Sequence, residues 1–207
     1  MRTLLYLCFC LTFALWPAAG ADVKEDLRSP DSKRRAKAAE ELGKQRDAQD
    51  VPALRGLLKD PEREVRAEAV AAIVSIGTQH SLPPLIEATH DSEPSIQIMA
   101  VDGLVNFYYP GYVQTGWTAA LKKFGTSVKG RFTEVNTLVV DPYVTVSPDV
   151  VAAIGRVATG GTSLEARGLA ARALGILRAR AAAPLLIQAL SSKEKDSDVI
   201  LESLRAL

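Results

Sequence analysis

The chain has 207 residues, of which 47% are hydrophobic, and 25 Lys and Arg stand against 24 Asp and Glu, so that the formal net charge is +1. A balance this close to neutral disfavours nucleic acid as the partner, because proteins that bind it carry a clear basic excess. The length suffices for one good-sized domain, or one run of repeats, with an apolar core.

The N-terminus has the three parts of a secretory signal peptide. Arg2 precedes an apolar, uncharged run at residues 4–16, and small residues follow at 17–21. A helix that crosses a bilayer needs roughly 17 to 25 apolar residues, and a buried soluble helix would normally show some polar face. We therefore predict that residues 1–21 are removed and that the mature chain is exported to the periplasm or the extracellular space.

Both cysteines, Cys8 and Cys10, lie in this predicted signal peptide. The mature chain would then contain no disulfide, no thiolate metal site and no cysteine nucleophile, although its compartment permits disulfides. Its stability has to come from an apolar core.

A shift of 31 residues aligns residues 22–109 with themselves twice. Within each unit, apolar residues recur three and four positions apart, which predicts amphipathic helices. Each unit is therefore expected to be a hairpin with a short first helix, an Asp-Pro or Asp-Ser turn and a longer, alanine-rich second helix. One hairpin cannot bury its own apolar face, so we expect the hairpins to stack. The aligned positions include Arg35, Arg66 and Gln97, and also Leu42, Ile73 and Leu104.

The pattern returns in residues 147–207. Ala166, Arg167, Ala170 and Leu174 repeat a second helix, and a further shift of 33 residues carries Leu174 onto Leu207. The last unit is thus expected to be incomplete and to lack the polar cap that a solenoid needs. Truncation of a longer array is the favoured explanation, ahead of cover by a partner or by a second copy. The predicted fold class is all-α: an α-solenoid of stacked helical hairpins with one irregular insertion.

That insertion, residues 110–146, cannot be aligned with the 31-residue unit. No acidic residue occurs from 103 to 133, while basic and aromatic residues are interleaved there. We expect a short helix at 117–124 and an extended segment at 136–145. The candidate partner-binding residues are Tyr112, Trp117, Lys122, Lys123, Lys129 and Arg131.

Long insertions in repeat arrays often form the binding face. Cations interleaved with aromatic rings suit an acidic protein surface, a phosphorylated or sulfated polymer, or lipid headgroups. The alternative is structural: Trp117, Phe124 and Phe132 fold back over the gap in the solenoid, and the lysines are merely solvated. Both interpretations stay open at this point.

The segment D-P-x-x-x-V-R-x-x-A-x-x-A-I at residues 60–73, with its echo E-A-R-G-L-A-A-R-A-L-G-I-L at 165–177, resembles a HEAT repeat of the phycobilisome-lyase-like type. The resemblance covers residues 23–107 and 147–207. It implies a concave surface, lined by second helices, that binds other proteins; a minority of such arrays are enzyme subunits or bind nucleic acid. It also assigns Arg35, Asp60, Arg66 and Arg167 to a structural ladder of hydrogen bonds between hairpins, from which Gln97 departs.

Catalysis finds little support in the residues. His80 and His90 are ten positions apart and do not form a convincing zinc or iron pair, and neither belongs to a His-Glu pair of the kind used by HEAT-type metal hydroxylases. Residues 160–163, Gly-Gly-Thr-Ser, fit a turn and a helix cap better than a phosphate-binding loop. We therefore expect no metal, no cofactor and no enzymatic activity.

Two functional hypotheses follow. The favoured one is an exported, non-enzymatic scaffold that binds another protein of the cell envelope or secretome through its concave face and its insertion. The alternative is a surface module that docks onto an anionic polymer or membrane through the insertion, and its binding would weaken steeply with ionic strength. A lyase-like or chaperone role ranks third.

Overall fold

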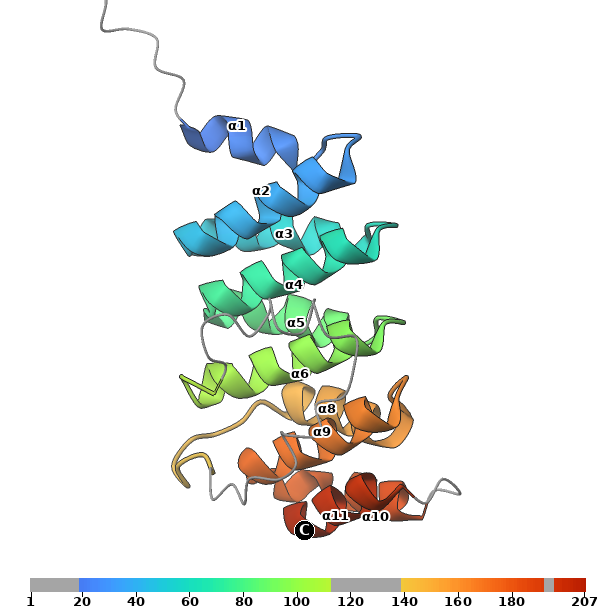
Figure 1. The fold of residues 1–207 in the computed structure, drawn as a ribbon. Coiled ribbons are helices and arrows are strands. Elements are labelled where there is room, and N and C mark those ends of the chain that lie inside the picture. Colours follow the sequence, from blue (N-terminus) through green and yellow to red (C-terminus); the bar gives the residue numbers. More distant parts are fainter. Residues whose placement is uncertain (1–18, 113–138, 192–195) are drawn as a thin grey trace, which may run out of the picture.

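The computed structural model describes residues 19–112, 139–191 and 196–207, and within these ranges every regular element is a helix. The helices form successive hairpins that stack into one column, with the first helix of most hairpins behind the second (Figure 1). The chain is an α-solenoid of stacked helical hairpins, so the predicted fold class is confirmed.

Two layers make up the column. The first-helix layer contains α1 (Ala19–Asp26), α3 (Val51–Gly56), α5 (Leu82–Ala88), α8 (Pro148–Gly160) and α10 (Ala183–Leu190). The second-helix layer contains α2 (Ser32–Gln45), α4 (Arg63–Ile76), α6 (Pro94–Tyr108), α9 (Leu164–Ile176) and α11 (Ser197–Ala206). Short 3-10 turns adjoin the first helices: η1 (Ala48–Asp50), η2 (Leu57–Lys59), η3 (Gln79–Ser81) and η5 (Arg180–Ala182).

The ends of the helices follow from local chemistry. The Asp31 carboxylate accepts a hydrogen bond from the Lys33 N–H at 2.9 Å and thereby caps α2, and the Ser163 hydroxyl caps α9 in the same way. The residue after α4 is Gly77, in the left-handed region with φ 61°, which glycine enters without a steric penalty. Most first helices begin with a proline in their first turn, where the missing N–H costs nothing.

The aligned apolar positions form the core. Leu42, Ile73 and Leu104, which the 31-residue shift superimposes, are all completely buried, and Leu174 occupies the matching place in α9. Leu54 and Leu85 are buried from the first-helix layer. The repeat thus places equivalent side chains at equivalent heights along one continuous core.

The solenoid continues past the predicted insertion, because α6 packs directly on α9. Of the insertion, residues 113–138 lie outside the described residues. Its described parts, residues 110–112 and 139–146, contain neither helix nor strand, and the second of them is held by one hydrogen bond near its start and by another at Ser147, which directly follows it. The Val140 N–H donates to the Ile176 carbonyl at 2.8 Å, and the Ser147 N–H donates to the Tyr108 hydroxyl at 3.0 Å.

Small residues let successive second helices approach closely. A Cβ added to Gly43 of α2 would lie 2.7 Å from the Ala72 Cα of α4. A Cβ on Gly103 of α6 would collide with the Val74 side chain, and one on Gly175 of α9 would lie 3.1 Å from the Ala206 Cα of α11. The missing side chains therefore set the spacing between these helices.

We expect Gly43→Ala to lower the free energy of unfolding by about 1–3 kcal/mol, because the new methyl group meets backbone atoms and the two helices have to separate. Gly56→Ala is the matched control: this glycine is also helical, but it is exposed, and a Cβ added to it would have no atom within 4 Å. The control should be neutral or up to about 1 kcal/mol more stable. Urea denaturation of both variants tests this, and equal stability of the two would contradict it.

Candidate functional site

An ion pair joins the turn of each early hairpin to the next. The Arg35 guanidinium donates to both carboxylate oxygens of Asp60, at 2.7 and 2.9 Å, and to the Ser29 carbonyl of its own turn at 2.8 Å. One repeat later, Arg66 donates to both oxygens of Asp91, at 2.7 and 3.1 Å, and to the Asp60 carbonyl at 3.0 Å. Asp60 therefore binds the arginine of the preceding hairpin with its side chain and that of its own hairpin with its backbone.

The third junction uses neutral partners. Gln97 stands where the arginines stand, and its amide N–H donates to the Asp91 carbonyl at 2.9 Å. Its amide oxygen accepts hydrogen bonds from the Thr162 N–H and hydroxyl at 2.9 and 3.0 Å. The position that would supply an aspartate is Gly161, whose carbonyl accepts from Arg167 at 2.9 Å. Both members of the ion pair are thus replaced by neutral residues, the arginine by Gln97 and the aspartate by Gly161.

The ladder changes the acidity of Asp60. Burial by itself would raise the pKa of this carboxyl, but hydrogen bonds from Arg35 and from the Glu62 N–H outweigh it, together with the charges of Arg35 and Arg66. The net effect is a lowered pKa. The carboxylate is nearly inaccessible, with a side-chain exposure of 7%, so solvent screens the pair only weakly.

Ion pairs also bridge the first-helix layer at its first two junctions. Lys24 Nζ of α1 lies 2.6 Å from the carboxylate of Asp50, which immediately precedes α3. At the next junction Arg55 of α3 donates to Glu87 of α5 at 2.7 Å, and Lys59 Nζ lies 3.6 Å from the other carboxylate oxygen. The Arg55 hydrogen bond contributes most to the lowered pKa of Glu87.

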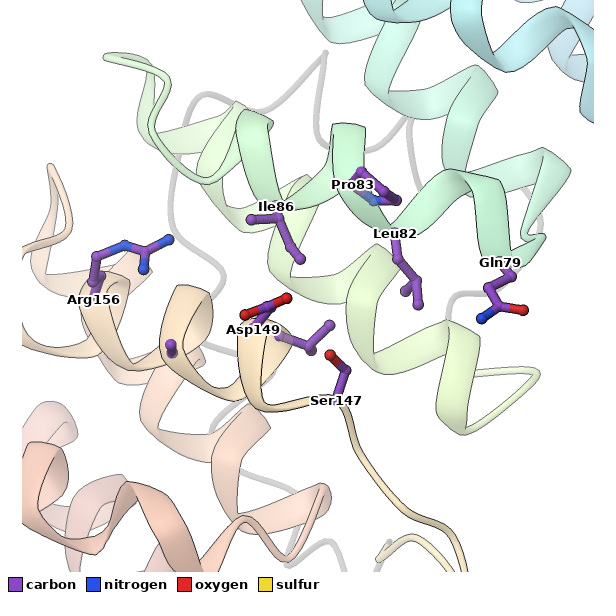
Figure 2. A pocket seen from close by; sticks show the side chains of 9 residues that line it. Gln79, Leu82, Pro83, Ile86, Ser147, Asp149 and Arg156 are labelled. Carbon is purple, nitrogen blue, oxygen red and sulfur yellow. The ribbon is translucent and has the colours of Figure 1, made fainter.

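At the third junction of this layer, no ion pair joins α5 to α8 within the described ranges. The residue that aligns with Arg55 under the 31-residue shift is Ile86. A groove of about 480 Å³ lies between the two helices, here called the α5–α8 groove. Figure 2 shows Leu82 and Ile86 pointing from α5 toward α8. Val150 of α8 completes its apolar walls.

Polar groups stand along the same groove. Asp149 lies next to Ile86, Arg156 stands at one end, and Gln79 and Ser147 stand at the other (Figure 2). Asp149 and Arg156 are both exposed, and neither forms an ion pair within the described part of the chain. A second, wider depression beside α1 and α2 has almost wholly charged and polar walls. Of these two hollows, the α5–α8 groove is the one that combines apolar walls with charged side chains.

The predicted site residues are distributed as follows. Arg35, Asp60, Arg66 and Arg167 lie at the turns between hairpins, with the contacts given above. Tyr112 is partly buried against the core. Trp117, Lys122, Lys123, Lys129 and Arg131 lie outside the described residues, as does the predicted helix at 117–124.

Sequence reasoning did not identify the α5–α8 groove. Asp149 and Arg156 carry no motif, and Ile86 is an ordinary apolar residue in an apolar helix. One signal was present: the 31-residue alignment places Ile86 on Arg55, which exchanges a bridging charge for a hydrophobic side chain. Its meaning depends on the structure, because only there does Arg55 meet Glu87.

Among the residues that the structure describes, no cluster of three or more His, Cys, Asp or Glu side chains is arranged to hold a metal ion. None of the described helices combines the length and apolar character needed to cross a bilayer.

Two segments of the chain match families of known proteins. Residues 22–114 match the family model of HEAT repeats, and residues 166–192 match that of the PBS lyase HEAT-like repeat. Matches to models of HEAT-type repeats therefore lie on both sides of the insertion, where the sequence motifs indicated them. A comparison with curated proteins finds no match.

Several solved structures are similar to the chain. The complex of CpcE and CpcF of phycocyanin lyase from a Nostoc species has 21% identity and a TM-score of 0.43, over 89% of this chain and 74% of that one. Human deoxyhypusine hydroxylase has 20% identity and a TM-score of 0.37, over 92% and 73%. A designed armadillo repeat protein has 19% identity and a TM-score of 0.34, over 90% and 97%.

We expect Asp60→Asn to be destabilising at neutral pH and nearly neutral in strong acid. A carboxyl whose folded pKa lies below its unfolded value stabilises the fold above the unfolded pKa, and this contribution is lost as the pH falls through the folded pKa. Urea denaturation from pH 7 down to the acid limit of folding measures the difference between wild type and variant. The control Glu64→Gln removes an exposed carboxylate of α4, and a pH-independent gap for Asp60→Asn would contradict the ladder's role.

Proposed function

We propose that the protein is an exported, non-enzymatic scaffold that binds another protein, and that the α5–α8 groove is part of its binding surface. The observation that carries this proposal is the junction between α5 and α8, where a groove stays open. Ion pairs close the first-helix layer at its first two junctions, whereas the third leaves partly buried Leu82 and Ile86 along an open groove. An apolar patch with a polar rim is a common mark of a protein-binding surface.

The repeat architecture supports the same proposal, because stacked helical hairpins provide extended surfaces on which partners bind. The second-helix layer and the insertion belong to the proposed surface as well. The insertion is included because cations and aromatic side chains concentrate in its sequence. Export is supported by the signal-peptide pattern of residues 1–21.

A surface module for an anionic polymer or membrane is the second candidate. The absence of acidic residues from 103 to 133, together with Lys122, Lys123, Lys129 and Arg131, favours it. Such contacts are electrostatic and weaken steeply with salt, whereas apolar contacts in a groove do not. The two candidates therefore make opposite predictions for a binding experiment at two ionic strengths.

The experiment is a crosslinking pull-down from the exported fraction of the host at low and at high salt. Ile86→Arg should abolish capture of the partner protein, because the new guanidinium fills the groove and faces Asp149 as Arg55 faces Glu87. The chain already accepts arginine at this repeat position, so stability should change by no more than about 1 kcal/mol. Ile86→Leu is the matched control and should retain capture.

The insertion is tested in parallel by changing Lys122, Lys123, Lys129 and Arg131 together to Glu. If this variant and high salt both abolish binding, and the captured material is lipid or polymer, the second candidate replaces the first. If Ile86→Arg captures the same protein as wild type, the groove is not the binding surface.

A further inference from the structure

The α5–α8 groove has the form of a site for one more helix. We propose that its occupant is an amphipathic helix of the partner protein, which lies antiparallel to α8 and carries an acidic residue two turns before a basic one, with an apolar stripe between them. This inference rests on the protein-binding function proposed above and specifies the chemistry of the partner.

The apolar walls call for apolar side chains at helical spacing. Leu82 and Ile86 are four residues apart on α5, and Val150 faces them from α8. Two helices that flank a groove present ridges into which the side chains of a third helix fit at spacings of three and four. At about 480 Å³ the groove has room for several such side chains.

At the next junction of the first-helix layer, a leucine side chain fills the space between the two helices. Between α8 and α10, the Leu185 side chain packs so closely on Gly155 that a Cβ there would collide with it. Between α5 and α8, a groove of about 480 Å³ stays open. A partner's leucine would make in this groove the kind of contact that Leu185 makes one repeat later.

The charges define the direction of the occupant. Asp149 and Arg156 lie on the groove side of α8, seven residues and therefore roughly 10 Å apart along the helix. A complementary helix places a cation over Asp149 and an anion over Arg156. In the antiparallel orientation the anion is nearer the N-terminus of the partner helix and the cation nearer its C-terminus, which is the arrangement that the helix dipole favours.

The resulting pattern is Glu-x-x-Leu-Leu-x-x-Lys. Glu at the first position meets Arg156, the two leucines pack on the partly buried Leu82 and Ile86, and Lys at the eighth position meets Asp149. Because both charges of the site are unpaired among the described residues, the partner displaces no existing ion pair when it binds. Electrostatic complementarity of this kind selects partner and orientation more than it adds affinity.

The test uses two fluorescein-labelled synthetic peptides of identical composition, one with Glu-x-x-Leu-Leu-x-x-Lys and one with Lys and Glu exchanged. Fluorescence anisotropy with the full chain at low salt should show the first peptide binding roughly tenfold more tightly, because two attractive contacts become repulsive in the second. The double variant D149K/R156E should invert this preference. Circular dichroism should show that the first peptide gains helix on binding.

Equal affinities for the two peptides, or a preference that D149K/R156E leaves unchanged, would overturn the proposed occupant, as would the absence of binding by either peptide. A first peptide whose leucines are changed to Ser should lose binding, and undiminished binding would also overturn it. The protein-binding function is judged separately by the pull-down: capture that is sensitive to Ile86→Arg, combined with a failed peptide test, leaves the groove as a binding surface and refutes only the helical occupant.

Discussion

The bond from a second-helix arginine to the aspartate of the following turn fixes the register in which the first three hairpins stack. Arg66 binds Asp91 with two nitrogens and holds the Asp60 carbonyl with the third, so one planar side chain fixes its own turn and the next. This bidentate geometry leaves little freedom to slide. The close approach of Gly43 to Ala72 requires such a fixed register.

At the third junction, between α6 and α9, neutral groups replace the arginine and the aspartate, so the exchange leaves no buried charge without a partner. An arginine at position 97 would face Gly161 and find no carboxylate, and a buried guanidinium without a partner is costly. Gln97 instead accepts two hydrogen bonds from Thr162, which satisfies the neutral amide. The substitution in one hairpin thus fits the substitution in the next, and the second-helix layer stays continuous from α6 to α9.

The repeats could be predicted from the sequence because equivalent side chains recur at a constant spacing along the chain. The 31-residue shift superimposes Leu42, Ile73 and Leu104, and all three are buried in the core. The α5–α8 groove was not accessible, because its two walls are separated by an insertion whose length has no template. No periodicity indicates how far α8 lies from α5, and Asp149 and Arg156 can be assigned to the groove only once that spacing is known.

The irregular features of the chain coincide at one junction. The neutral ladder pair, the insertion and the α5–α8 groove all occur where the α5–α6 hairpin meets the α8–α9 hairpin, and Ser147, which directly follows the insertion, lines the groove. In a solenoid, each hairpin gains its stability from its immediate neighbours, so a change at one junction leaves the flanking pairs intact. Binding chemistry placed at this junction therefore costs the rest of the array little, whereas the same apolar groove at an earlier junction would require the loss of an ion pair such as that between Arg55 and Glu87.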